Sequence, residues 1–421
     1  MTDPTSTDGS CGCSDFRLTR RDLLRGAAAM TGAAVTTSLV GDVFTQTAYG
    51  NALGGNVLVV VSLRGGADGL SLVVPHGDPG YAQARPHIGV PTGSLLAKDA
   101  MFGLHPAFQP LLPMWTAGTL AAVHAVGMPQ PNRSHFAAME EVEDADPGSP
   151  ERRGWINRMV GLMGASDPVR GMQLGSAVVP TALYGPEPTV ALRNYQKFQL
   201  PAATGSWSAP TRQSLTTAWS SEETPLGRGA MSALDVTQRL AGLAGTQPPA
   251  NGAVYPTTSL GDALAASART IRADVGARVI AVDCGAWDHH TGQGTVQAGQ
   301  LLTNATDLAK SLAAFLKDLG TVGDRVTVLT ISEFGRRVRE NGGNGTDHGH
   351  GNCMLALGAG VRGGRYLAQW PGLAAGNLVQ GDLAVTTDYR SVLSEAVAAR
   401  FPEVSAPQVF PGFIPSQVGL F

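Results

Sequence analysis

The feature that most constrains the fold is a continuous apolar run near the start of the chain, residues 56–63 (NVLVVVSL). A run so rich in β-branched residues, without polar alternation, is typical of a strand buried on both faces of a parallel sheet. Similar runs recur at residues 119–126 (TLAAVHAV), 277–282 (ARVIAV) and 325–331 (RVTVLTI), and helix-like segments separate them. This alternation predicts an α/β fold with a doubly wound, mostly parallel sheet.

Residues 1–50 have the character of a twin-arginine export signal. Arg20 and Arg21 precede a weakly apolar, uncharged stretch at 26–40, and residues 48–50 (AYG) form a small-residue cleavage site. A basic helix start before an ordinary amphipathic helix is the alternative. A permanent membrane span is not expected, because it needs about 20 strongly apolar residues. We therefore expect the Tat export machinery as a partner and a location in the cell envelope or outside the cell.

The remaining residues, 51–421, are expected to form a single α/β domain with a cap or surface excursion around 184–255, within which residues 201–225 are rich in Ser, Thr and Pro. The formal net charge of −3 disfavours nucleic acid as a partner. Cys284 and Cys353 are the two thiols of this part of the sequence. They form either one bridge or two buried thiols, since two cysteines make no disulfide framework.

Polar clusters follow four of the predicted strands. They are Asp68; Ser134 with His135; Asp283, Asp288, His289 and His290; and Glu333, Asp347, His348 and His350. Because the carboxyl ends of parallel strands meet at one edge of a sheet, these side chains can lie together. Oxygen and nitrogen donors of this kind suit one or two divalent ions, zinc first, with manganese, magnesium or calcium as alternatives.

Such a site would act on a small-molecule or polymer-borne anionic ester, because metals held by carboxylates and histidines stabilise the attacking and leaving oxygens in displacement at phosphorus or sulfur. Ser134 is the candidate nucleophile, or else it positions a water, and Arg64, Arg133 and Arg336 can contact the anionic oxygens. The structural alternatives are an N-cap for Ser134, a turn for Asp68 and salt bridges for the arginines. Glu333 fits either ligation or the orientation of a histidine or Arg336.

Six short motifs follow one another along the chain: LRGGADGL (63–70), PNRSHF (131–136), GAWDHHTGQ (285–293), SEFGR (332–336), TDHG (346–349) and TTDYR (386–390). In these motifs the chain resembles the bacterial DUF1501 family, exported proteins placed in the alkaline phosphatase/sulfatase-like superfamily. The resemblance implies an alkaline-phosphatase-like core with Asp68 as the first-strand ligand and Ser134 in the nucleophile region. It also implies that Asp288 and His290 bind one metal and that Asp347 and His348 form the adjacent ligand pair.

Two departures from the superfamily pattern concern the metal ligands. Alkaline phosphatases place three residues between their Asp and His ligands, whereas only His289 separates Asp288 from His290 here. They also supply a final histidine well downstream, and this sequence has none after His350. Either His350 or Asp388 substitutes for it, or the second metal site is altered or empty.

Three functions follow from these observations. The first is an exported metal-dependent hydrolase of phosphate or sulfate esters. The second is a metal-binding or assembly protein of the cell envelope that keeps the fold without turnover, and the third is another metal-dependent hydrolase or transferase on the same scaffold. A formylglycine sulfatase is not expected, because the residues after Ser134 lack the required C/S-x-P-x-R context.

Overall fold

The computed structural model describes residues 54–195, 205–245 and 247–421. Its main sheet has nine strands in the order β10-β4-β9-β8-β1-β7-β5-β6, and β11 also pairs with β4. Strand β9 is antiparallel to β4 and β8, and all other pairs are parallel. The strands are β1 (Val57–Leu63), β4 (Leu120–Gly127), β5 (Gly171–Leu174), β6 (Val190–Leu192), β7 (Val279–Cys284), β8 (Val326–Ile331), β9 (Asn352–Gly358), β10 (Arg365–Leu367) and β11 (Thr387–Asp388).

The four strands expected from apolar runs are all present, as β1, β4, β7 and β8. Strand β1 lies at the centre of the sheet, between β7 and β8, and every one of its residues is buried. Val57, Val59 and Val61 join one hydrophobic cluster, while Leu58 and Val60 join the other. Because both faces are covered, the run needs no polar alternation. The expected doubly wound, mostly parallel α/β fold is confirmed.

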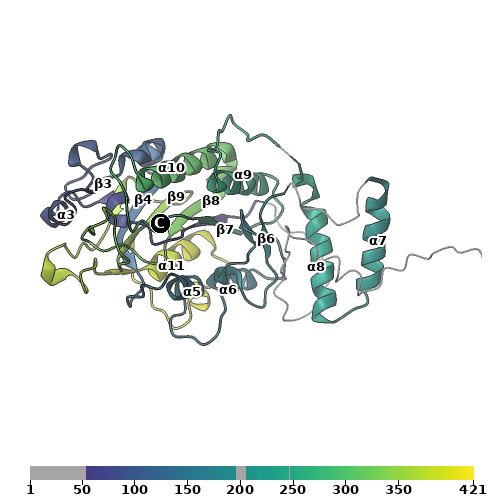
Figure 1. Cartoon of the computed structure of the whole chain (residues 1–421). Coiled ribbons are helices and arrows are strands. Elements are labelled where there is room, and N and C mark those ends of the chain that lie inside the picture. The colour runs from purple at the N-terminus through teal and green to yellow at the C-terminus, as the bar shows by residue number, and fades with distance from the viewer. Residues whose placement is uncertain (1–53, 196–204, 246) are drawn as a thin grey trace, which may run out of the picture.

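Helices cover both faces of the sheet (Figure 1). Helices α9 (Ser259–Arg272) and α10 (Gln300–Leu319) pack on one face, and α5 (His135–Asp144), α6 (Trp155–Gly161) and α11 (Tyr389–Arg400) on the other. Smaller elements are α2 (Gly69–Leu72), α3 (Pro79–Ala84), α4 (Leu112–Thr116), α12 (Ala406–Val409) and a two-stranded sheet of β2 (Val73–Val74) and β3 (Gly103–Leu104). No helix in the described ranges is long and apolar enough to cross a membrane.

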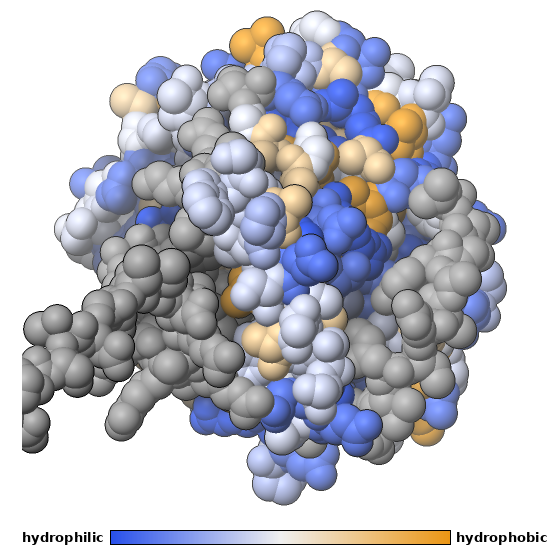
Figure 2. Space-filling view, turned by 90° about the vertical axis from the view of Figure 1, so that its right-hand side faces the viewer, coloured by the Kyte–Doolittle hydropathy of each residue, from blue (hydrophilic) through white to orange (hydrophobic). Residues whose placement is uncertain are grey.

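The region expected to form a cap or surface excursion contains the helices α7 (Ser208–Trp219) and α8 (Pro225–Arg239). The two helices contact each other and lie past the β6 edge of the sheet (Figure 1). Figure 2 shows this side of the molecule, with hydrophobic residues scattered among hydrophilic ones. Exposed Trp207 and Leu226 belong to this region, and single exposed hydrophobic residues are ordinary on protein surfaces. The expected export signal at 1–50 lies outside the described residues.

Cys284 and Cys353 are both buried and free, so the two-thiol alternative holds. Cys284 ends β7, and Cys353 lies in β9. Burial raises the pKa of each thiol to about 12, which keeps both protonated at neutral pH. These cysteines act as small core residues and not as reactive groups.

Candidate metal centre

Asp288 lies in the loop that follows β7, and three histidines surround its carboxylate. Its Oδ1 is 3.0 Å from Nε2 of His290 and 3.2 Å from Nε2 of His348. Its Oδ2 is 3.4 Å from Nε2 of His135. The Nε2 atoms of His290 and His348 are only 2.9 Å apart. We call Asp288, His135, His290 and His348 the histidine cluster.

Each histidine of the cluster faces an oxygen with its other ring nitrogen. Nδ1 of His135 is 2.8 Å from Oε1 of Glu333, and Nδ1 of His348 is 2.8 Å from the backbone oxygen of Arg133. Nδ1 of His290 is 3.3 Å from Oδ1 of Asp347. Because a neutral imidazole carries one proton, donation from Nδ1 leaves a lone pair on Nε2. This assigned tautomer is the one that a metal-ligating histidine needs.

The cluster fits a divalent ion. Nε2 of His135 is buried and has no hydrogen-bond partner, although buried ring nitrogens are normally satisfied. One donor atom each from His135, Asp288 and His348 lie within 4.8 Å of one another. Two or three imidazole nitrogens with one carboxylate oxygen form a donor set typical of zinc. An ion between them would satisfy the unpaired nitrogen and separate the two Nε2 atoms that now face each other.

Arg336 supports the cluster from inside the protein. Its side chain is fully buried and donates to Oδ1 of Asp288 at 2.6 Å and to the backbone oxygens of Gly66 and Thr346. Burial would raise the pKa of Asp288, but Arg336, together with His348 and His290, lowers it to about 2. The Asp288 carboxylate is therefore ionised at neutral pH, as ligation requires.

The glycine pair after β1 allows the cluster to form. Gly65 has φ +116° and Gly66 has φ +67°, which other residues rarely adopt. A Cβ on Gly65 would lie 2.7 Å from the backbone nitrogen of Asp288, and one on Gly66 would lie 2.5 Å from the ring of Phe334. The loop after β1 thus passes directly against the loop that carries Asp288.

Glu333 orients His135. Its side chain is buried, and Oε1 accepts hydrogen bonds from the backbone nitrogen of Gly65 at 2.8 Å and from Nδ1 of His135 at 2.8 Å. Of the two roles expected for Glu333, the geometry matches orientation of a histidine. His135, the first residue of α5, belongs with Ser134 to one of the polar clusters predicted from the sequence. It is not among the residues that the resemblance names as ligands. Its position directly after a strand–turn segment is the signal that could have identified it.

The structure does not bring Asp68 into the histidine cluster. Arg85 holds the Asp68 carboxylate in two contacts, Nη1 to Oδ2 at 2.5 Å and Nη2 to Oδ1 at 2.9 Å, and Gln293 donates to Oδ2 at 2.7 Å. Burial would raise the pKa of Asp68, but the charge and hydrogen bonds of Arg85 lower it. Both oxygens are thus occupied by protein donors, which explains the departure from the expected ligand role.

His350 and Asp347 also differ from the expectation. Nε2 of His350 is 2.8 Å from the backbone oxygen of Met128, and its imidazole lies outside the histidine cluster. Burial lowers the pKa of His350. Asp347 is exposed and accepts from Asn341 at 2.9 Å as well as facing Nδ1 of His290. The structure thus places Asp347 behind a candidate ligand, where it positions His290.

The residues expected to act on the substrate have different surroundings. Arg64 contacts Asp283 at 2.5 Å and Glu143 at 2.7 Å, so two carboxylates face one guanidinium. Arg133 donates to Asp382 and to the side chain of Gln380. Ser134 is exposed at the N-cap of α5, and its hydroxyl makes no capping hydrogen bond. The hydroxyl of Ser134 therefore remains available next to His135.

Comparison with known proteins gives no match among curated sequences. Among solved structures, the chain is similar to the zinc complex of the C-terminal periplasmic domain of EptC from Escherichia coli (11% identity, TM-score 0.33, covering 74% of each chain). It is also similar to the lipoteichoic acid synthase LtaP from Listeria monocytogenes (9% identity, TM-score 0.32, covering 79% of this chain and 75% of the other). A protein in the alkaline phosphatase superfamily from Vibrio parahaemolyticus gives 11% identity and a TM-score of 0.29, covering 82% of this chain and 71% of the other.

Because these TM-scores are low, the fold and the chemistry of the site are inferred from the chain's own geometry. The sequence comparison is decisive about the family. The model of a family described as "Protein of unknown function (DUF1501)" matches residues 100–394, which is more than half of the 421 residues. The matched range includes the three histidines and Asp288. The chain belongs to the DUF1501 family.

Proposed function

We propose that this chain is a metal-dependent hydrolase of phosphate or sulfate esters. The observation that carries the proposal is the convergence of three Nε2 atoms on Asp288, with each Nδ1 facing an oxygen. His135, Asp288, His290 and His348 would hold one divalent ion, and zinc fits this donor set best. Such an ion supplies Lewis-acid stabilisation of negative charge on the ester oxygens.

Ser134 supplies the nucleophilic hydroxyl in this proposal, or else it positions a water. It immediately precedes His135, so it lies at the rim of the histidine cluster, and its hydroxyl makes no capping bond. It also lies at the N-terminus of the ten-residue helix α5. The free amide groups and the dipole at that end favour an anion. An anionic ester can therefore approach Ser134 without electrostatic opposition from the helix.

Arg133 and Arg337 are the residues that would bind the anionic oxygens. Both approach the single buried carboxylate of Asp382: Nε of Arg133 at 3.1 Å and Nε of Arg337 at 4.0 Å. Their side chains remain 30% and 40% exposed, so two partly exposed cations share one anion. Arg64, expected in the same role, faces two carboxylates and leaves no such surplus of positive charge. Guanidinium groups suit this task because they bind oxyanions in two contacts.

The export of the chain is part of the proposal. The support is the twin-arginine pattern of residues 1–50. Fractionation of cells that express the native chain and an Arg20→Lys/Arg21→Lys double variant tests it. The native chain is expected outside the cytoplasm and the variant inside it, whereas equal distribution would contradict export.

The test of the activity is turnover of aryl phosphate and aryl sulfate esters by the zinc-loaded protein. The Ser134→Ala variant is expected to lose about 100-fold or more in kcat, because it lacks the nucleophile. Ser208→Ala, on the exposed start of α7, serves as the matched control and is expected to leave kcat unchanged. Stoichiometric metal without turnover of any ester would instead support the non-catalytic metal-binding or assembly protein of the cell envelope.

A further inference from the structure

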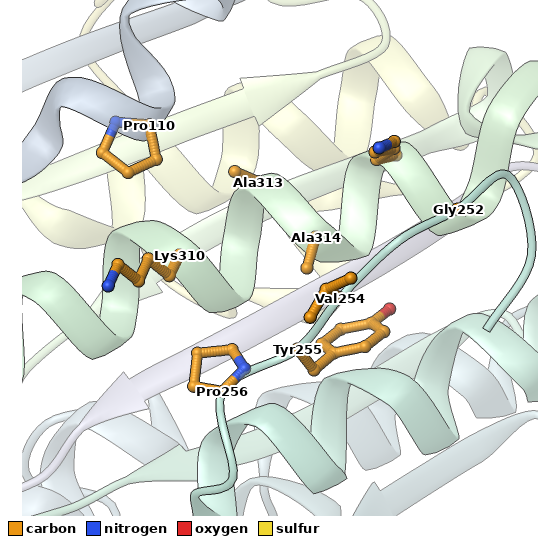
Figure 3. A pocket seen from close by; sticks show the side chains of 9 residues that line it. Pro110, Gly252, Val254, Tyr255, Pro256, Lys310, Ala313 and Ala314 are labelled. Atoms are coloured by element: carbon orange, nitrogen blue, oxygen red, sulfur yellow. The ribbon is translucent and has the colours of Figure 1, made fainter. Parts of the chain in front are cut away.

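A groove of about 470 Å³ lies on the outer surface of α10 (Figure 3). One wall is the segment 252–256, which runs beside the second half of the helix, and Pro110 lies on the other side of the helix. Ala313 and Ala314 of α10 form the floor. Asn304, near the start of α10, contacts His289 and so lies on the side of the metal centre. From Asn304 to Lys317 the helix rises about 20 Å.

A buried carboxylate holds the wall of the groove against α10. Asp318 of α10 accepts from the backbone nitrogen of Ala250 at 2.6 Å and from the hydroxyl of Tyr255 at 3.0 Å, and its backbone oxygen accepts from Asn251. The Asp318 side chain is almost completely buried, and Arg272 lies 3.3 Å from it. A buried carboxylate bonded at two points fixes the segment to the helix. The groove is therefore preformed, as ligand sites usually are.

The wall also contains a left-handed turn that presents an apolar side chain to solvent. Asn251 and Gly252 have φ values of +53° and +63°, a left-handed conformation that asparagine and glycine adopt more readily than other residues. Just after this turn, Val254 is 84% exposed. A single exposed valine on a flexible loop would be unremarkable. Here a fixed, left-handed turn and a buried carboxylate hold it in place, which points to an apolar contact with another molecule.

The positive charges at the groove indicate that its ligand is acidic. Lysine occurs four times in the sequence, at positions 98, 197, 310 and 317, and two of these line the groove. Both are exposed, and neither makes an ion pair with any residue that the structure describes. The ammonium of Lys317 lies over Gly252, since a Cβ there would be 3.9 Å from Nζ. Seven positions along α10 separate the two lysines by about 10 Å on one face of the helix.

We propose that this groove binds a proline-rich segment of a partner protein that carries two acidic side chains three residues apart. In a polyproline II helix, residues three apart lie on the same face and are about 9 Å apart, which matches the spacing of the two lysines. The apolar residues between the acidic ones would contact Val254, Tyr255 and Pro256. Grooves lined by aromatic residues and proline are the usual receptors for this conformation.

The test is fluorescence anisotropy with the full chain and two labelled peptides, acetyl-Ala-Glu-Pro-Val-Glu-Pro-Ala and its counterpart with Lys at both Glu positions. The acidic peptide is expected to bind saturably and the basic one is not. A Lys310→Glu/Lys317→Glu double variant is expected to bind the acidic peptide at least about tenfold more weakly and to gain binding of the basic peptide. Lys98→Glu, outside the groove, serves as the matched control and is expected to bind like the native chain.

Three results of the binding assay would overturn the proposal. These are no saturable binding of the acidic peptide up to millimolar concentration, equal binding of both peptides, and binding that the double variant leaves unchanged. A dimer that forms in the native chain and is lost in the double variant would also overturn it, in favour of a contact between two copies. Thermal unfolding and metal content of each variant show whether the fold and the histidine cluster are intact, so the result is independent of the proposed hydrolase.

Discussion

Asp68 and Asp288 both follow strands of the same parallel sheet, yet their surroundings differ completely. The residue Asp68 is only 1% exposed, and its carboxylate is bound by Arg85 and Gln293. The side chain of Asp288 is 45% exposed, and its oxygens face three histidines. The two positions are alike in sequence, since each lies in a glycine-containing turn after a buried apolar strand.

The difference lies in the groups that reach each carboxylate. The guanidinium of Arg85 carries a permanent charge and binds both Asp68 oxygens, so this carboxylate is neutralised by a protein cation and not by a metal. The imidazoles around Asp288 have lone pairs of their own and lie at the surface, where an ion can enter. Asp68 is therefore a structural residue in this account, and Asp288 is the centre of a metal site. The following predictions test that division.

The largest expected effect is on stability, in an Arg85→Met variant. Removing one partner of a buried ion pair leaves the other charge buried and unpaired, which lowers the free energy of unfolding by about 3–5 kcal/mol. Chemical denaturation measures this. The matched control is Arg152→Met, whose exposed pair with Glu140 contributes at most about 1 kcal/mol. Equal changes in the two variants would show that Asp68 and Arg85 are not the structural pair described.

A smaller effect is expected on metal affinity in a Glu333→Gln variant. Loss of the carboxylate that orients a metal-bound histidine lowers metal affinity by about 10–100-fold. Titration with zinc against a chromogenic chelator measures the change. Glu340→Gln is the matched control, because Glu340 also bonds Nδ1 of a histidine, His87, away from the cluster. If both variants bind zinc like the native chain, Glu333 does not position a ligand.

The smallest expected effect concerns acid stability. The pKa of Asp68 in the folded chain lies below its ordinary value of 3.8. The stability gained from ionised Asp68 is thus fully present above that pH and is lost as the pH falls through the folded-state pKa. The Asp68→Asn variant is expected to be less stable at neutral pH and to lose less stability between pH 5 and pH 3. A parallel pH dependence in both proteins, followed by urea denaturation, would contradict the ion pair.

The positions of the strands could be predicted from the sequence better than the contacts between individual side chains. Continuous apolar runs identify β1, β4, β7 and β8, because a strand buried on both faces leaves a strong signal. The antiparallel direction of β9 leaves no such signal, since burial on both faces does not depend on direction. The predicted sheet architecture also indicated correctly that the loops after β1, β7 and β8 lie close together.

The partners within the site depend on tertiary contacts that spacing does not encode. Arg85 reaches Asp68 across 17 positions, and nothing in the local pattern distinguishes it from other arginines. His348 and His350 are two residues apart, yet one faces Asp288 and the other faces the backbone of Met128. A Cβ on Gly349, between them, would lie 2.4 Å from the backbone of Arg336, so this loop packs backbone against backbone. That packing determines where each histidine points.

The measurement that tests the central claim most directly is the metal content of three proteins purified under one protocol: the native chain, Asp288→Asn and Asp68→Asn. Elemental analysis is expected to find about one divalent ion per native chain, and zinc to be preferred in competition. Asp288→Asn is expected to lose the ion while it stays folded, and Asp68→Asn to keep it at the native stoichiometry. Metal that is lost in Asp68→Asn but retained in Asp288→Asn, or no metal in the native chain, would contradict the account.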